Sequence, residues 1–165
     1  MNAVKKSTSI AIASKIAAIA SLLRSQIPYA QIDFSPWVEN DLTLRFEDRH
    51  SIDLSVNLPR VSQKLQCRCM LLQVTVPYVD VASPVSVGHL QGDFGGYETA
   101  VEVEFSGYGF DGTQQWKFAT VNGGQFSGAT LPTSDGQQLI EELVQRILEL
   151  FPSLKIVEIE SRKAS

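Results

Sequence analysis

The sequence predicts an α+β fold: a single, mostly antiparallel sheet of about five to seven strands, covered by an N-terminal and a C-terminal amphipathic helix. Three observations predict it. Apolar residues recur with helical spacing near both ends of the chain, and they alternate with polar residues in between. Tight-turn dipeptides separate the alternating segments, so the strands come in runs rather than alternating with helices.

Length and composition fit one domain over residues 1–165. A chain of 165 residues is close to the ~150 residues of an average domain, and its 44% apolar content is that of a globular protein. A core of this size needs neither disulfides nor metal. We expect residues 1–7 and 160–165 to be frayed termini.

The first element is a helix that ends at Pro28. Ser7, Thr8 or Ser9 can cap its start. Its apolar stripe consists of Ile12, Ile16, Ile19, Ala20, Leu23 and Ile27. Ser14 and Lys15 interrupt the apolar run, which argues against a signal peptide, and the run is too short to span a membrane. Packing on the sheet is favoured over binding to a membrane surface.

Strands follow at residues 30–34, 42–46 and 52–58. The last two are expected to form a hairpin around a polar turn at 48–50, and Pro59 is expected to end it.

Residues 66–76 carry apolar side chains on both faces, which indicates a central strand ending at Pro77. Cys67, Cys69 and Leu71 are expected on one side of it. A disulfide between two strand residues two apart is unfavourable, so we expect Cys67 and Cys69 to be reduced and unreactive.

A long loop is predicted over residues 80–96, which contain one proline and four glycines. A meander then resumes, with strands at 97–105, around 116–120 and around 126–130. Asp111-Gly112 and Asn122-Gly123 mark the two turns between these strands.

The second helix shows the clearest pattern in the chain. Ser134 and Gln137 have the spacing of a capping box, and Pro152 stops the helix. Its apolar stripe is Leu139, Ile140, Leu143, Val144, Ile147 and Leu148. A last short strand is indicated at 156–159.

The residue types of a catalytic or metal site are sparse. His50 and His89 with the two cysteines could form a zinc site by number alone, but their spacing matches no zinc motif. A catalytic thiol would need a partner base, which the strand context of the cysteines does not supply.

An acidic strand face and a glycine-rich loop are two further candidates. Glu98, Glu102 and Glu104 share one face of a strand; they could act as acid and base or hold Ca²⁺ or Mg²⁺, but a solvated face predicts the same pattern and is favoured. Residues 89–96 match neither a phosphate-binding loop nor a dinucleotide fingerprint.

The long loop supplies the interface candidates. It holds Val85, Val87, Leu90 and Phe94 among glycines, so it could contact a partner protein, although a simple connection between sheet halves is equally consistent.

The functional prediction is a non-catalytic association protein, an oligomer subunit or adaptor in a larger assembly, including ring or connector components of phage-like particles. No catalytic, cofactor or metal residues are assigned. The alternatives are a small apolar-ligand-binding domain and an enzyme with an unrecognised Asp/Glu/Tyr site.

Charge and cysteine content limit the partners and the compartment. With 14 basic and 18 acidic residues, no clustered basic face is present, so a protein partner or self-association is expected rather than nucleic acid. Reduced thiols suit a cytoplasmic location, or a particle made in the cytoplasm.

Overall fold

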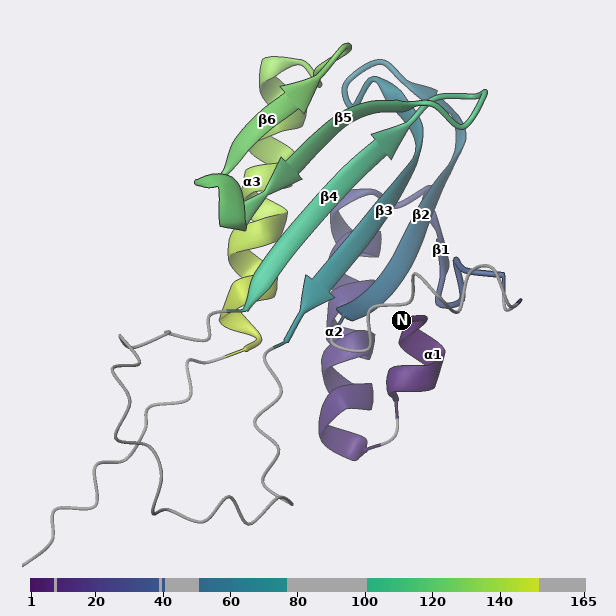
Figure 1. Cartoon of the computed structure of the whole chain (residues 1–165), viewed down its shortest axis with the longest axis vertical. Helices are drawn as coiled ribbons and strands as arrows, with labels where there is room; N and C mark the ends of the chain where they lie inside the picture. The colour runs from purple at the N-terminus through teal and green to yellow at the C-terminus, as the bar shows by residue number, and fades with distance from the viewer. Residues whose placement is uncertain (8, 39, 41–50, 77–100, 152–165) are drawn as a thin grey trace, which may run out of the picture.

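A computed structural model describes residues 1–7, 9–38, 40, 51–76 and 101–151. Within these residues, six strands form one antiparallel sheet in which spatial order follows sequence order, from β1 to β6. Two long helices lie behind the sheet, and among the described residues no long helix covers the opposite, open face (Figure 1). The α+β prediction is confirmed.

The elements run in the order helices, strands, helix. Their bounds are α1 (Ala3–Lys6), α2 (Ile10–Gln26), β1 (Gln31–Asp33), β2 (Ser51–Ser62), β3 (Cys67–Thr75), β4 (Glu102–Tyr108), β5 (Gln114–Ala119), the 3₁₀ helix η1 (Thr120–Asn122), β6 (Gln125–Gly128) and α3 (Ser134–Glu149).

The core lies between the helices and one face of the sheet. The helices contribute the apolar stripes that the sequence predicts, and the strands contribute every second residue. The largest fully buried side chains are Trp116, Phe105, Ile19, Leu23, Ile27, Ile52, Leu54, Leu65, Met70, Leu72, Ile140 and Leu143.

The two long helices meet at one end. Lys15 of α2 donates to the carbonyl of Leu150, just after α3, and its ammonium lies 4.9 Å from the centre of the Phe151 ring. A cation at the carbonyl end of a helix is favourable because the helix dipole is negative there.

The start of α3 differs from the prediction. Thr133, not Ser134, is the N-cap, and its hydroxyl accepts from the amide of Gly136 at 3.3 Å. Gln137 donates to the carbonyl of Pro132 instead of completing a capping box. The N-cap lies one residue earlier than the motif indicates, where the backbone N–H and the hydroxyl of Thr133 both donate to the carbonyl of Lys64 in the turn between β2 and β3.

One strand limit and one chain end differ from the prediction. β2 continues through Pro59 to Ser62, because the ladder with β3 is irregular between Asn57 and Ser62 and a proline there breaks no regular pairing. Residues 1–7, expected to be frayed, contain α1 and place Ala3 in the core.

The later strands follow the predicted order, but their first and last residues differ from the prediction. β4 extends to Tyr108, and Thr120, expected in a strand, begins η1. Gly123 has a φ of 75°, which suits glycine in this turn. The predicted strands at 42–46 and 156–159, the turn at 48–50, the loop at 80–96, Pro152 and the tail at 160–165 lie outside the described residues.

Candidate functional site

The helix-covered face of the sheet is filled by its own side chains. Trp116 of β5 lies across Gly107 of β4, where an added Cβ would come within 2.3 Å of the indole ring. The indole nitrogen donates to the carbonyl of Leu65 at 2.6 Å, so this buried N–H is satisfied. Phe126 of β6 extends the aromatic cluster, with its ring centre 4.8 Å from that of Phe118.

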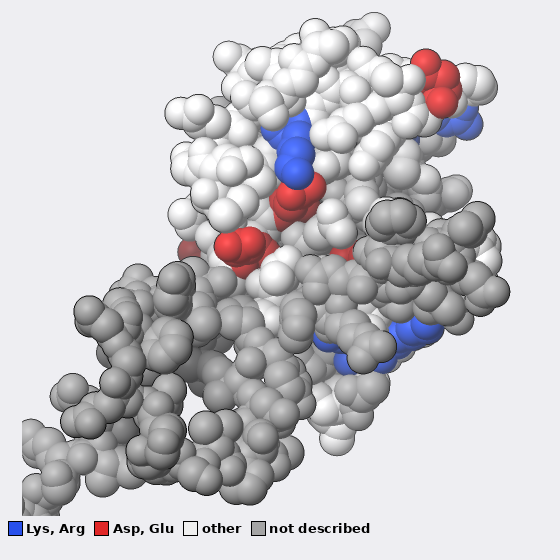
Figure 2. Space-filling model, in the orientation of Figure 1, with Lys and Arg blue, Asp and Glu red and all other residues white. Residues whose placement is uncertain are grey.

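The open face carries mainly polar side chains. Residues that pair across antiparallel strands share a face, so the register defines this surface. It comprises Gln31, Asp33, Ser51, Asp53, Ser55, Asn57, Cys69, Leu71, Gln73, Thr75, Glu102, Glu104, Ser106, Tyr108, Lys117, Ala119, Gln125 and Ser127. Figure 2 shows a few Lys, Arg, Asp and Glu side chains on the described part of this side.

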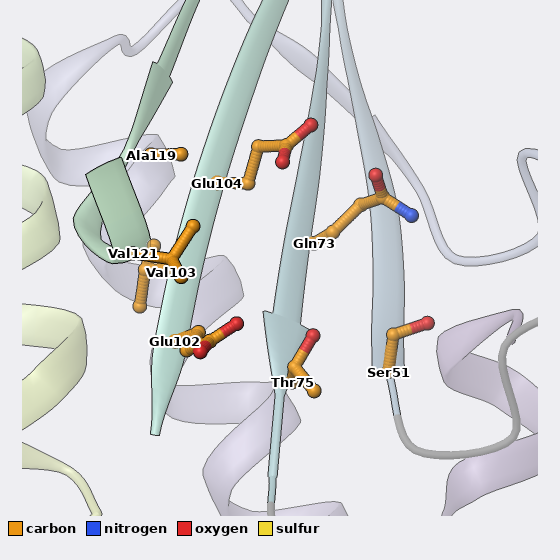
Figure 3. A pocket seen from close by; sticks show the side chains of 8 residues that line it. All are labelled: Ser51, Gln73, Thr75, Glu102, Val103, Glu104, Ala119 and Val121. Atoms are coloured by element: carbon orange, nitrogen blue, oxygen red, sulfur yellow. The ribbon is translucent and has the colours of Figure 1, made fainter. Parts of the chain in front are cut away.

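A shallow hollow of about 160 Å³ lies on this face. It is lined by Ser51, Gln73, Thr75, Glu102, Val103, Glu104, Ala119 and Val121 (Figure 3). Glu104 is held by Lys117 at 2.8 Å, which offsets its charge. The hollow therefore offers hydroxyl, amide and carboxylate groups, and none of the described residues that line it is a histidine or a cysteine.

Asp53 is the buried acidic residue of this face. Its carboxylate accepts from the indole N–H of Trp37 and from the α-amino group of Met1, each at 2.6 Å, and Gln73 lies 3.4 Å away. A charge this buried must be paired, and here it is. Asp53 therefore acts as a structural anchor that holds the segment around α1 on the sheet.

That segment protects the β1 end of the sheet. Asn2 forms a parallel bridge with Asp53 of β2. Because Gln73 of β3 pairs with Asp53 on one side, this bridge lies on the other side of β2, next to the part that pairs with β1. The Asn2 side chain exchanges two hydrogen bonds with the backbone of Trp37. β1 itself has three residues and includes Asp33. Short length and charge are both common means of preventing edge pairing.

The β6 edge is almost as short, at four residues, but it carries no charge, and no other described segment pairs with its outer side. The sequence from Ala119 to Ser134 contains no charged residue, and its one proline, Pro132, lies beyond the strand. β6 pairs with β5 over four residues and is the last strand of the described sheet. Gln125, Ser127 and Gly128 are exposed and Phe126 is half-buried. An edge of this kind presents unpaired backbone groups that can template another strand.

A wider groove of about 810 Å³ lies at the turn end of β2. It is lined by Tyr29, Pro59, Arg60, Val61, Ser62, Gln63 and Lys64. Tyr29 and Val61 are both more than half exposed, so the groove combines apolar surface with two cations.

The cysteines are free, as predicted, but they do not share one environment. Cys67 lies in the core, where burial, and then the charge of Cys69, raises its thiol pKa to about 12. Cys69 is half-buried, and its thiol pKa is raised by burial and then by Asp33. The irregular pairing at the start of β3 explains the difference, because the two residues no longer follow a simple two-residue alternation. Thiols with raised pKa values are poor nucleophiles at neutral pH.

The structure tests few of the predicted site residues. Glu102 and Glu104 do share the open face, whereas Glu98, His50, His89 and the interface candidates Val85, Val87, Leu90 and Phe94 lie outside the described residues. Among the residues that the structure does describe, no group of three or more His, Cys, Asp or Glu side chains could hold a metal ion. No helix in the described ranges is long and apolar enough to cross a membrane.

Sequence reasoning missed the β6 edge as a candidate site. The available signal was the absence of charge over residues 119–134, but strand order is needed to know that β6 lies at an edge. It also missed Asp53 as an anchor, because alternation places Asp53 on a face assumed to be solvated.

Comparison with known proteins gives a family and nothing more specific. No curated protein and no solved structure matches the sequence. A family model described as a domain of unknown function matches residues 4–153, and the chain therefore belongs to that family.

Proposed function

We propose that this protein is a non-catalytic association module, a subunit or adaptor of a larger assembly. The observation that carries the proposal is the β6 edge, which is uncharged and, within the described residues, uncovered. Natural sheets usually protect such edges, as the β1 end of this sheet does, because unprotected edges pair with other chains. An edge left in this state is consistent with use as a contact.

The composition of the open face supports the same function. It offers hydroxyls and amides from neighbouring strands, which suit the hydrogen bonds of a protein interface. Two carboxylates of this face are engaged, Asp53 by Trp37 and Glu104 by Lys117, so these two are poorly placed to act as acid and base. A ring or connector subunit of a phage-like particle is one assembly that such a module would suit.

Light scattering on the purified chain tests the proposal. We expect a mass above that of one 18.2 kDa chain at concentrations of tens of micromolar, falling on dilution. A mass of one chain at every concentration, together with no partner recovered from the native extract, would contradict it and favour the small-ligand alternative.

A further inference from the structure

We infer that the partner at the β6 edge is a second copy of this chain, paired antiparallel with the first through β6. This inference rests on the proposed function and specifies its contact. It begins from the four residues Gln125–Gly128, whose inner side pairs with β5 in regular antiparallel register.

The geometry of self-pairing is constrained by symmetry. When two identical strands pair antiparallel, the two-fold axis is perpendicular to the sheet, and the contact uses the same residues from both copies. The helix layers then lie on the same side of a continuous sheet. Residues that face each other across the contact come from the same face, so Phe126 can face only helix-side residues, and Gln125 and Ser127 only open-side residues.

Every such pairing is free of like charges. Gln125, Phe126, Ser127 and Gly128 are all uncharged. The nearest cation on the neighbouring strand, Lys117, pairs with Ser127 across the ladder and is held by Glu104 at 2.8 Å. The same operation at β1 would bring two copies of Asp33 into one contact of three residues, and a register that places them opposite one another would be destabilised by their like charges.

Phe126 supplies an apolar centre for the contact. Its ring lies 5.9 Å from that of Trp116 and 4.8 Å from that of Phe118, yet the side chain remains partly exposed at the edge. A second Phe126 across the two-fold axis would cover that exposed part and continue the aromatic cluster. Aromatic residues are common anchors at the centre of interfaces.

Matched edge substitutions test this inference. Gln125→Lys places a charge on the β6 edge, and Gln31→Lys makes the same change at the exposed first residue of β1. Light scattering over a dilution series would compare both variants with the unmodified chain, and circular dichroism would confirm that each is folded. We expect Gln125→Lys to weaken association by roughly fivefold or more, and Gln31→Lys to leave it unchanged.

The outcomes separate the two proposals. If the unmodified chain associates but Gln125→Lys has no effect, or Gln31→Lys weakens association equally, the β6 contact is wrong while the association function stands. If the unmodified chain has the mass of one chain throughout, the second copy is wrong, and the association function is wrong as well when no partner is recovered from the native extract. A stable complex of one chain with a different protein, weakened by Gln125→Lys, would support β6 as the contact but show that the partner is not a second copy.

Discussion

The helix-covered face and the β6 edge of the same sheet differ in how completely their groups are buried and paired within one chain. On the covered face, the largest side chains are fully buried, and the indole N–H of Trp116 has an acceptor. At the β6 edge, the last strand leaves its outer backbone groups without a strand partner in the described part of the chain. The first region is complete within one chain, whereas we propose that the second is completed by pairing with another strand. Stability should therefore depend on the first and association on the second.

The largest effect is expected at Leu143, which is fully buried between α3 and the sheet. Leu143→Ala should lower the free energy of unfolding by about 2–5 kcal/mol, because it removes buried methyl groups and leaves a cavity. Denaturant unfolding measures this, with the exposed Glu142→Ala on the same helix as control. Equal midpoints for the two variants would show that α3 does not pack as described.

Gly107 tests the fit of Trp116 against β4. Gly107→Ala should cost about 1–3 kcal/mol, since the added methyl group would overlap the rigid indole ring. Gly109→Ala is the matched control, because its new methyl group would meet the movable amide of Gln115. A Gly107 variant as stable as the Gly109 variant would mean that the ring moves freely.

Burial of Cys67 should make stability depend on pH. Its thiol keeps its proton in the folded state up to about pH 12, whereas in the unfolded chain it ionises near its ordinary pKa of ~8.5. Rising pH therefore draws protons from the unfolded state only, and stability falls as pH increases above ~8.5. By pH 10 this loss should reach about 1–2 kcal/mol.

The variant Cys67→Ala isolates that contribution. Comparing its free energy of unfolding at pH 8 and pH 10 with that of the unmodified chain should show a smaller decrease. Rapid labelling of Cys67 by a thiol reagent at pH 8 without denaturant would contradict the buried, protonated thiol.

A smaller effect is expected at the cap of α3. Thr133→Ala removes the bond to the Gly136 amide and the bond to the Lys64 carbonyl, and should cost about 1 kcal/mol. Thr133→Ser should retain most of that stability. Ser134→Ala, at the residue that the sequence motif indicates, should change the free energy of unfolding little. A larger loss of stability in this variant than in Thr133→Ala would support the predicted capping box instead.

The same contrast explains how far the sequence could be interpreted. Local periodicity was sufficient for both long helices and for the strands at β1, β2, β3 and β4, because burying one face imposes a simple repeat. It failed where tertiary contacts decide. The carbonyl of Lys64 binds Thr133, which becomes the cap of α3. The irregular register between β2 and β3 accommodates Pro59 inside β2. The bridge between Asn2 and Asp53 adds the first residues of the chain to the sheet.

The candidate site was harder to predict than the fold for a physical reason. An edge is defined by which strand has no neighbour, and hydrogen bonds between strands leave no trace in the periodicity of either one. Residues Gln125–Gly128 therefore resemble any short strand until the order of the sheet is known.

Amide hydrogen exchange at low and high protein concentration tests the central claim most directly. Association through β6 should slow exchange at the outward-facing amides of Gln125–Gly128 as concentration rises, while the amides of β1 remain unchanged. Exchange in β6 that is independent of concentration, while the mass of the particle increases, would show that the chain associates through another surface.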